Sequence, residues 1–145
     1  MRLRDSTAAD TDILFEIWRR AVLATHDFVS AADLETFTRV VREDYLPNAV
    51  FRVAVDDDDR PHAFMGMSAA NIDSLFVDPA LHGNGIGRLL IEYAKQQHTG
   101  GLTVDVNEQN EQALGFYRKM GFRVTRRSPV DDTGKPYPLL SLAWP

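Results

Sequence analysis

The chain has 145 residues, is 44% hydrophobic, contains no cysteine and carries a formal net charge of −5. This length and composition predict one globular domain over residues 1–145, with a single buried core. The lack of cysteine excludes disulfides, thiolate metal sites and a cysteine nucleophile, and we expect no metal cofactor. The acidic balance and the absence of a basic run argue against a nucleic-acid partner and favour an amine-bearing substrate.

No apolar run is long enough to span a membrane, so we expect no membrane partner. The chain begins with Met1-Arg2-Leu3-Arg4 and then turns polar, which does not fit the apolar core of a signal peptide. We therefore expect a cytoplasmic protein.

In the first half of the chain, the pattern predicts a strand, two helices and then three strands. Ser6 or Thr7 is expected to cap the first helix and Ser30 the second, which Pro47 ends. Four adjacent aspartates at 56–59 predict a solvated hairpin turn, with a cation site as the alternative. The expected strands are residues 2–4, 50–55, 61–69 and 71–77.

The second half begins with a glycine-rich loop, followed by an amphipathic helix that Gly100-Gly101 ends. A strand at 102–106, a helix at 110–120 and strands near 122–127 and 138–144 follow. The whole order predicts an α/β fold with a mixed, mostly antiparallel central sheet and helices on both faces. The apolar last strand is also a candidate surface for a homodimer.

The loop His82-Gly83-Asn84-Gly85-Ile86-Gly87-Arg88 joins a strand to this helix. Its bare N–H groups and the positive end of the helix dipole predict a phosphate site, to which Arg88 adds a charged donor. The loop is neither a dinucleotide fingerprint, because Arg88 occupies the place of the third glycine, nor a Walker loop. By itself the pattern also fits a plain turn between a strand and a helix.

The pattern His82-x-x-Gly85-x-Gly87 resembles the donor-binding motif Gln/Arg-x-x-Gly-x-Gly/Ala of the GCN5-related N-acetyltransferase family. A second segment, residues 110–122, resembles the family's Asn-x-x-Ala-x-x-Phe-Tyr-x-x-x-Gly-Phe. The resemblance covers essentially the whole chain and implies an acyl-CoA N-acyltransferase fold with acetyl-CoA as co-substrate. It implies acetyl transfer to an amine of a small molecule or peptide, by direct attack in a ternary complex.

The resemblance also implies which residues bind the coenzyme. The main chain of Leu75, Phe76 and Val77 is expected to bind the pantetheine arm, and Asn110 is expected to contact the coenzyme. A helix cap alone would also explain Asn110. His82 departs from the family's Gln or Arg, since a neutral imidazole lacks a fixed charge. The expected pyrophosphate-binding residues are His82, Gly83, Asn84, Gly85, Ile86, Gly87 and Arg88.

Two catalytic residues are expected. The resemblance assigns to Tyr117 the proton donor for the departing thiolate, with a core aromatic as the alternative. Strand alternation places Asp105 and Asn107 on one face, where Asp105 is a candidate base and Asn107 a candidate substrate contact. An exposed strand carboxylate is the alternative for Asp105, and a water relay or His26 remains open as the base.

The segment Thr25-His26-Asp27-Phe28 lies in the region that walls the acceptor site in this family. His26 and Phe28 are therefore expected to contact the substrate. A histidine interacting with the helix dipole and a core phenylalanine are the alternatives.

The competing functions are a non-catalytic acetyl-CoA sensor or interaction module, and a transferase for a longer acyl group.

Overall fold

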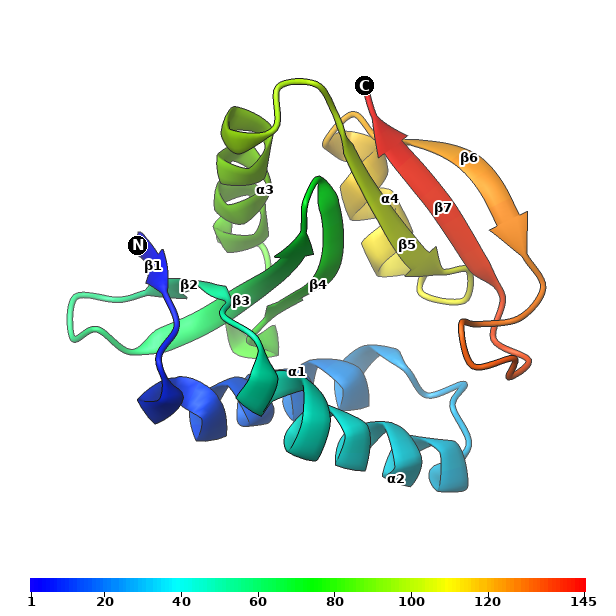
Figure 1. Cartoon of the computed structure of the whole chain (residues 1–145), viewed down its shortest axis with the longest axis horizontal. Helices are drawn as coiled ribbons and strands as arrows, with labels where there is room; N and C mark the ends of the chain where they lie inside the picture. The colour runs from blue at the N-terminus through cyan, green and yellow to red at the C-terminus, as the bar shows by residue number, and fades with distance from the viewer. The chain divides into compact units, whose positions relative to one another are not determined.

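The computed structural model describes all residues 1–145, in seven strands and four α-helices (Figure 1). The strands are hydrogen-bonded in the order β1-β2-β3-β4-β5-β7-β6. The β4–β5 pair is parallel, whereas β1–β2, β2–β3, β5–β7 and β6–β7 are antiparallel. This mixed sheet and the element order confirm the predicted fold class. None of the helices has the length and apolar character needed to cross a bilayer.

The chain forms two compact units. Unit 1 comprises Met1–Gly66 and Ser74–Leu90, and unit 2 comprises Met67–Asp73 and Ile91–Pro145. The elements wholly or partly in unit 1 are β1 (Arg2–Asp5), α1 (Thr11–Thr25), α2 (Ala31–Val40), β2 (Arg52–Val55), β3 (Pro61–Ser68), β4 (Asn71–Val77) and α3 (Ile86–Gln97). Those wholly in unit 2 are β5 (Leu102–Asn107), α4 (Glu111–Lys119), β6 (Arg123–Ser128) and β7 (Leu139–Trp144).

The first helix starts later than its predicted cap. Thr7 caps a short 3-10 turn, Ala8–Asp10, and α1 begins only at Thr11. The turn is held by Asp10, whose carboxylate accepts the Thr7 N–H at 2.8 Å and two hydrogen bonds from Arg4 at 2.8 and 3.0 Å. The Arg4 hydrogen bonds are the main cause of the lowered pKa of Asp10. The tertiary partner, which a local pattern does not reveal, therefore sets the start of the helix.

The second helix is capped by Ser30, as predicted, with the Asp33 N–H donating to Ser30 Oγ at 3.1 Å. Its apolar stripe runs beyond the α-helix, because Val41–Tyr45 form a π-helical turn. Pro47 lies within the 3-10 turn Leu46–Asn48 that follows. The wider π turn brings the Tyr45 hydroxyl within 2.6 Å of Ser74 Oγ on β4.

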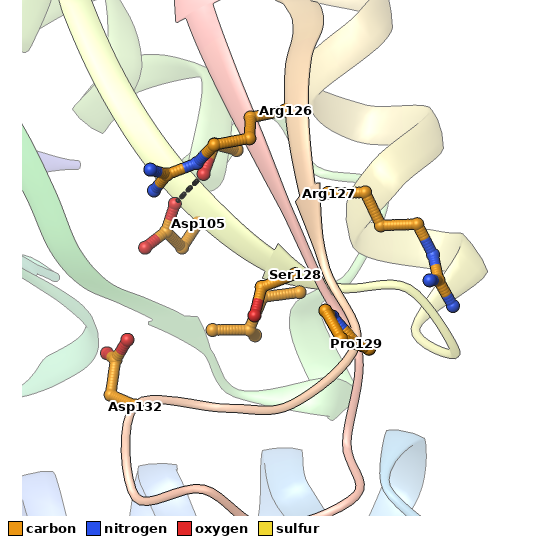
Figure 2. Close-up of a pocket in the computed structure, with 8 residues that line it drawn as sticks. Asp105, Arg126, Arg127, Ser128, Pro129 and Asp132 are labelled. Carbon is orange, nitrogen blue, oxygen red and sulfur yellow. Dashed lines mark hydrogen bonds between the residues drawn. The ribbon is translucent and has the colours of Figure 1, made fainter.

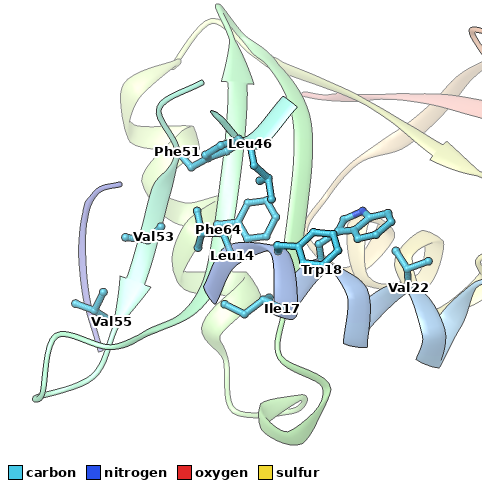
Figure 3. Close-up of a cluster of buried hydrophobic side chains, with 10 residues drawn as sticks. Leu14, Ile17, Trp18, Val22, Leu46, Phe51, Val53, Val55 and Phe64 are labelled. Carbon is cyan, nitrogen blue, oxygen red and sulfur yellow. The ribbon is translucent and has the colours of Figure 1, made fainter. Parts of the chain in front are cut away.

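The core of unit 1 is formed by α1 packing on the strands (Figure 3). Trp18 and Ile17 project from the helix, and Val53 and Phe64 project from β2 and β3. Phe51 and Phe64 meet edge to face with their ring centroids 5.2 Å apart. The apolar face of α1, with its 3–4 spacing, thus packs against the apolar face of the strands, where every second residue is apolar, as the sequence predicts.

Unit 2 is built around β5, β7 and β6, which lie side by side (Figure 1). On β5, Leu102, Val104 and Val106 are buried, while Thr103 and Asp105 are exposed and Asn107 is half-buried. This confirms the predicted alternation. The β6–β7 ladder contains a register shift between Val124 and Arg126, which is a β-bulge.

Candidate active site

The glycine-rich loop exposes a row of hydrogen-bond donors. Gly83 and Gly85 have φ values of +83° and +78°, a conformation that favours glycine. No backbone hydrogen bond outside the regular elements is donated by residues 83–88, although Gly85 accepts from Leu89 at 3.0 Å. A Cβ placed on Gly83 or Gly85 would meet open space. The loop therefore presents free N–H groups, an accessible surface and a helix N-terminus, a combination suited to an anion.

The loop is held in place by contacts on its entry side. Asp78 accepts the Ala80 N–H at 3.0 Å and forms an ion pair with Arg20 of α1 at 2.9 Å. Asn84 Nδ2 donates to the Leu81 carbonyl at 3.0 Å. These contacts hold the loop without using the N–H groups of residues 83–88.

The loop side chains differ in what they can contribute. His82 and Arg88 are exposed, and the His82 N–H donates to the Pro79 carbonyl at 3.3 Å. Ile86 is buried, with 5% of its surface exposed, so its side chain belongs to the core and only its N–H is open to a ligand. Asn84 supports the turn through its side chain.

Strand β4 carries the segment expected to bind the coenzyme arm. Its parallel ladder with β5 contains two registered pairs, Asn71 with Thr103 and Ile72 with Val104. Leu75, Phe76 and Val77 are half-buried. Phe76 packs against the core of unit 1, with its ring centroid 5.6 Å from that of Phe64. The side chain of Phe76 is therefore used in packing, so a ligand contact there would fall to the main chain.

In unit 2, Asn110 and Tyr117 lie on α4. Asn110 caps the helix, its Oδ1 accepting the Ala113 N–H at 3.1 Å, while its Nδ2 has no partner in the chain. Tyr117 is 6% exposed and meets the rings of Phe116 and Phe122 edge to face. Its hydroxyl has no hydrogen-bond partner in the chain.

Burial raises the pKa of Tyr117 above its usual value. The phenol consequently stays protonated throughout the neutral range, which is the state a proton donor needs. The ring packs in the core, as the alternative interpretation expected. The role of the hydroxyl as proton donor stays a prediction.

Asp105 and Asn107 both lie on β5. Asp105 lines a polar pocket of roughly 290 Å³, which Asn107 does not line (Figure 2). Ser141 Oγ donates to Asp105 Oδ1 at 2.7 Å. Asn107 Oδ1 accepts the Gln109 N–H at 3.0 Å, so this side chain supports the turn before α4. Glu108 is held by Arg127, whose hydrogen bond lowers the pKa of that carboxyl.

His26 forms the C-cap of α1 and contacts Phe28, with ring centroids 5.3 Å apart. The Thr25 hydroxyl donates to the Ala21 carbonyl at 2.8 Å and lies 2.7 Å from His26 Nδ1. Because that hydroxyl proton is used, Nδ1 carries the proton and donates to Thr25, which leaves Nε2 as an acceptor. Burial lowers the pKa of His26. A neutral imidazole fits the role of a base, whereas the interaction with the helix dipole would need the charged imidazolium.

The sequence does not predict two pairs of residues, one in each unit. Arg126 and Ser141 line the pocket with Asp105, but only the strand register reveals that they share its face. The Tyr45–Ser74 hydrogen bond joins residues 29 positions apart, and no local signal predicts it. No group of three or more His, Cys, Asp or Glu side chains is arranged to hold a metal ion.

Comparison with known proteins gives consistent matches. A family model described as an acetyltransferase (GNAT) domain matches residues 40–124. The chain is 50% identical to the peptidyl-lysine N-acetyltransferase YjaB of Salmonella typhimurium, covering 100% of this chain and 99% of that relative. The solution structure of apo-form YjaB from Escherichia coli aligns with a TM-score of 0.93 and 50% identity, covering 99% of this chain and 96% of that one. The PaiA N-acetyltransferase of Thermoplasma acidophilum, solved in complex with coenzyme A, shares the fold at 19% identity with a TM-score of 0.72, over 97% and 98% of the two chains.

Proposed function

Because the chain belongs to the GNAT acetyltransferase family and is therefore an N-acetyltransferase, we propose that it moves the acetyl group of acetyl-CoA to a lysine side chain of a peptide or protein. The relatives named as peptidyl-lysine N-acetyltransferases support a lysine acceptor. The net charge of −5 favours approach of a cationic side chain. The observation that carries the proposal is the loop segment 83–88, with its free N–H groups and left-handed glycines.

The loop fits the pyrophosphate of the coenzyme. Its N–H donors are free, and the space beside Gly83 and Gly85 is open. The resemblance keeps Asn110 as a coenzyme contact, for which its Nδ2 is the available group because its Oδ1 is engaged in the helix cap. On the family's pattern, the proposal also keeps the main chain of Leu75–Val77 as the segment that binds the pantetheine arm.

When bound, acetyl-CoA supplies a thioester carbonyl for attack. The lysine arrives as an ammonium and first gives one proton to a base. Its nitrogen then forms the new C–N bond as the C–S bond breaks, and it releases a second proton while the sulfur gains one, so the reaction releases one proton in total. Tyr117 is assigned the proton that the sulfur gains, since its buried phenol is protonated at neutral pH. The chain has no cysteine to form an acyl-cysteine intermediate, which supports direct attack in a ternary complex.

Asp105 is assigned the proton of the amine. One of its oxygens accepts from Ser141, and the other remains available to an ammonium. The competing base is His26, with its free Nε2 and lowered pKa. Comparison of Asp105→Asn with His26→Ala separates the two, because the true base lowers kcat while the other variant retains it.

The central test is Tyr117→Phe, which removes one oxygen and leaves the ring packing intact. We expect kcat to fall by about a hundredfold, the usual contribution of a positioned acid, with little change in KM for acetyl-CoA. The assay measures free thiol released from acetyl-CoA with a lysine peptide, and mass spectrometry locates the acetyl group.

Tyr137→Phe is the matched control, because Tyr137 is a buried tyrosine of the same unit, 7% exposed. It should retain its kcat. Equal turnover of Tyr117→Phe and the native protein would remove Tyr117 from its assigned role. Coenzyme binding without thiol release for any lysine peptide or other amine would instead favour the non-catalytic sensor.

A further inference from the structure

One face of unit 2 carries a row of three polar side chains across three strands. Ser141 on β7 lies opposite Asp105 on β5 and also opposite Arg126 on β6. Residues directly opposite each other in a sheet project from the same face. Asp105, Ser141 and Arg126 therefore form a continuous row, and all three line the pocket in Figure 2.

The β-bulge places Arg126 in this row. Regular pairing after Val124 would put Thr125 opposite Ser141 and turn Arg126 to the other face. The register shift instead sets Arg126 opposite Ser141, and the Thr125 hydroxyl secures it by donating to the Ser141 carbonyl at 3.1 Å. Bulges that re-aim a side chain in this way are common beside active sites.

The two charges at the ends of the row are not paired with each other. The Arg126 guanidinium makes no hydrogen bond or ion pair in the chain, and the Asp105 carboxylate accepts a hydrogen bond only from Ser141 Oγ. The neighbouring Arg127 differs, because its guanidinium extends away from Asp105 in Figure 2 and is bound to Glu108. The pocket therefore offers one available carboxylate oxygen and one available guanidinium, and Ser128 and Asp132 also line it.

Resting on the proposed lysine acetylation, we propose that this pocket selects lysines that have an acidic residue nearby in the same peptide. Asp105 binds the lysine ammonium before proton transfer, and Arg126 binds the glutamate or aspartate carboxylate through its planar fork. A basic neighbour would instead face the positive charge of Arg126 and be disfavoured. Arg126 is thus assigned as a specificity-determining residue for the acceptor.

The test uses short peptides with one lysine, in which a single glutamate is moved through the flanking positions and replaced by glutamine in the matched peptide. We expect at least one position at which glutamate raises kcat/KM by about fivefold to tenfold, a range suited to an exposed, charge-assisted contact. Arg126→Gln should abolish this preference and Arg126→Lys should restore part of it. Raising the salt concentration should weaken it in the native protein.

Arg123→Gln is the matched control. Arg123 also lies on β6, opposite Ala143, but it does not line the pocket and makes no ion pair. This variant loses the same charge and should keep the preference. A native enzyme that acetylates both peptides of every pair equally, or a preference that survives in Arg126→Gln, would overturn the inference.

If no peptide is acetylated, the proposed function is refuted but the role of Arg126 is not. A binding experiment then tests whether Arg126 recognises the acidic residue of the peptide. The glutamate and glutamine peptides are titrated into the full chain, and the Nε–H resonance of Arg126 is followed by NMR. We expect a shift with tighter binding for the glutamate peptide, and loss of that difference in Arg126→Gln. Equal Kd values for the two peptides, or no binding of either, would refute the assignment of Arg126.

Discussion

Gly66 on β3 lies where three parts of unit 1 converge, and replacing it by alanine is a stringent test of the packing. Its N–H donates to Ser74 Oγ at 3.2 Å, and the same oxygen is hydrogen-bonded to the Tyr45 hydroxyl at 2.6 Å. A Cβ at position 66 would overlap the Tyr45 hydroxyl and would lie 2.7 Å from Ser74 Oγ and 3.0 Å from Phe51 Cε1. The new methyl group must displace at least one of these atoms.

The expected magnitude follows from two contributions. Overpacking a buried site costs about 1–3 kcal/mol, and a broken hydrogen bond costs about 1 kcal/mol. We therefore expect Gly66→Ala to lower the free energy of unfolding by about 3 kcal/mol and Tyr45→Phe to lower it by about 1 kcal/mol. In the double variant the hydrogen bond is already lost and one overlapping atom is gone, so the loss should be about 2–3 kcal/mol instead of the sum, about 4 kcal/mol.

The assay is urea denaturation of the four proteins, followed by circular dichroism, with the m-value checked for constancy. Gly115→Ala is the control, since Gly115 lies in α4 with open space around its Cβ. It should be neutral or stabilising by about 0.5–1 kcal/mol. Strictly additive losses in the double variant would refute the overlap with Tyr45, and a Gly66→Ala protein as stable as the native one would refute the packing itself.

Two further predictions concern the Arg4–Asp10 ion pair before α1 and the glycine loop. Arg4 holds the pKa of Asp10 below its usual value. The pair therefore stabilises the fold above the unfolded pKa of about 3.9, and this stability is lost as the pH falls through the folded pKa. Asp10→Asn should flatten the decrease of Tm at acid pH, and an unchanged decrease would contradict the contribution of the ion pair. Gly85→Ala should cost about 1 kcal/mol of stability, because φ is +78° while the added Cβ meets nothing in the chain. It should nevertheless raise the Kd for coenzyme A at least ~10-fold, because the new methyl group lies beside the loop N–H groups. Isothermal titration calorimetry measures that Kd, and an unchanged value would remove the loop from the binding site.

Local sequence rules predict the elements and motifs well, because each depends on near neighbours. The Ser30 cap and the alternation on β5 follow from the residues themselves, and the structure confirms them. The family resemblance is likewise confirmed, since both motifs fall within the residues matched by the family model.

What the sequence does not predict depends on register or on distant partners. Counting alternate residues fails across the bulge on β6, so the face occupied by Arg126 cannot be read from its position. The late start of α1 depends on the Arg4–Asp10 pair, and the π turn before Leu46 brings Tyr45 to Ser74. The roles of the site residues remain predictions, to be tested as described above.

The division of the chain into two units also bears on the order in which the protein is synthesised. All residues of unit 1 have been made once translation reaches Leu90, whereas unit 2 combines Met67–Asp73 with a segment that ends at Pro145. Unit 1 can therefore begin to fold on the ribosome while the partner strand of Asn71 and Ile72 has not yet been made. Until β5 emerges, that part of β4 is an unpaired strand edge, the kind of surface on which nascent chains associate wrongly.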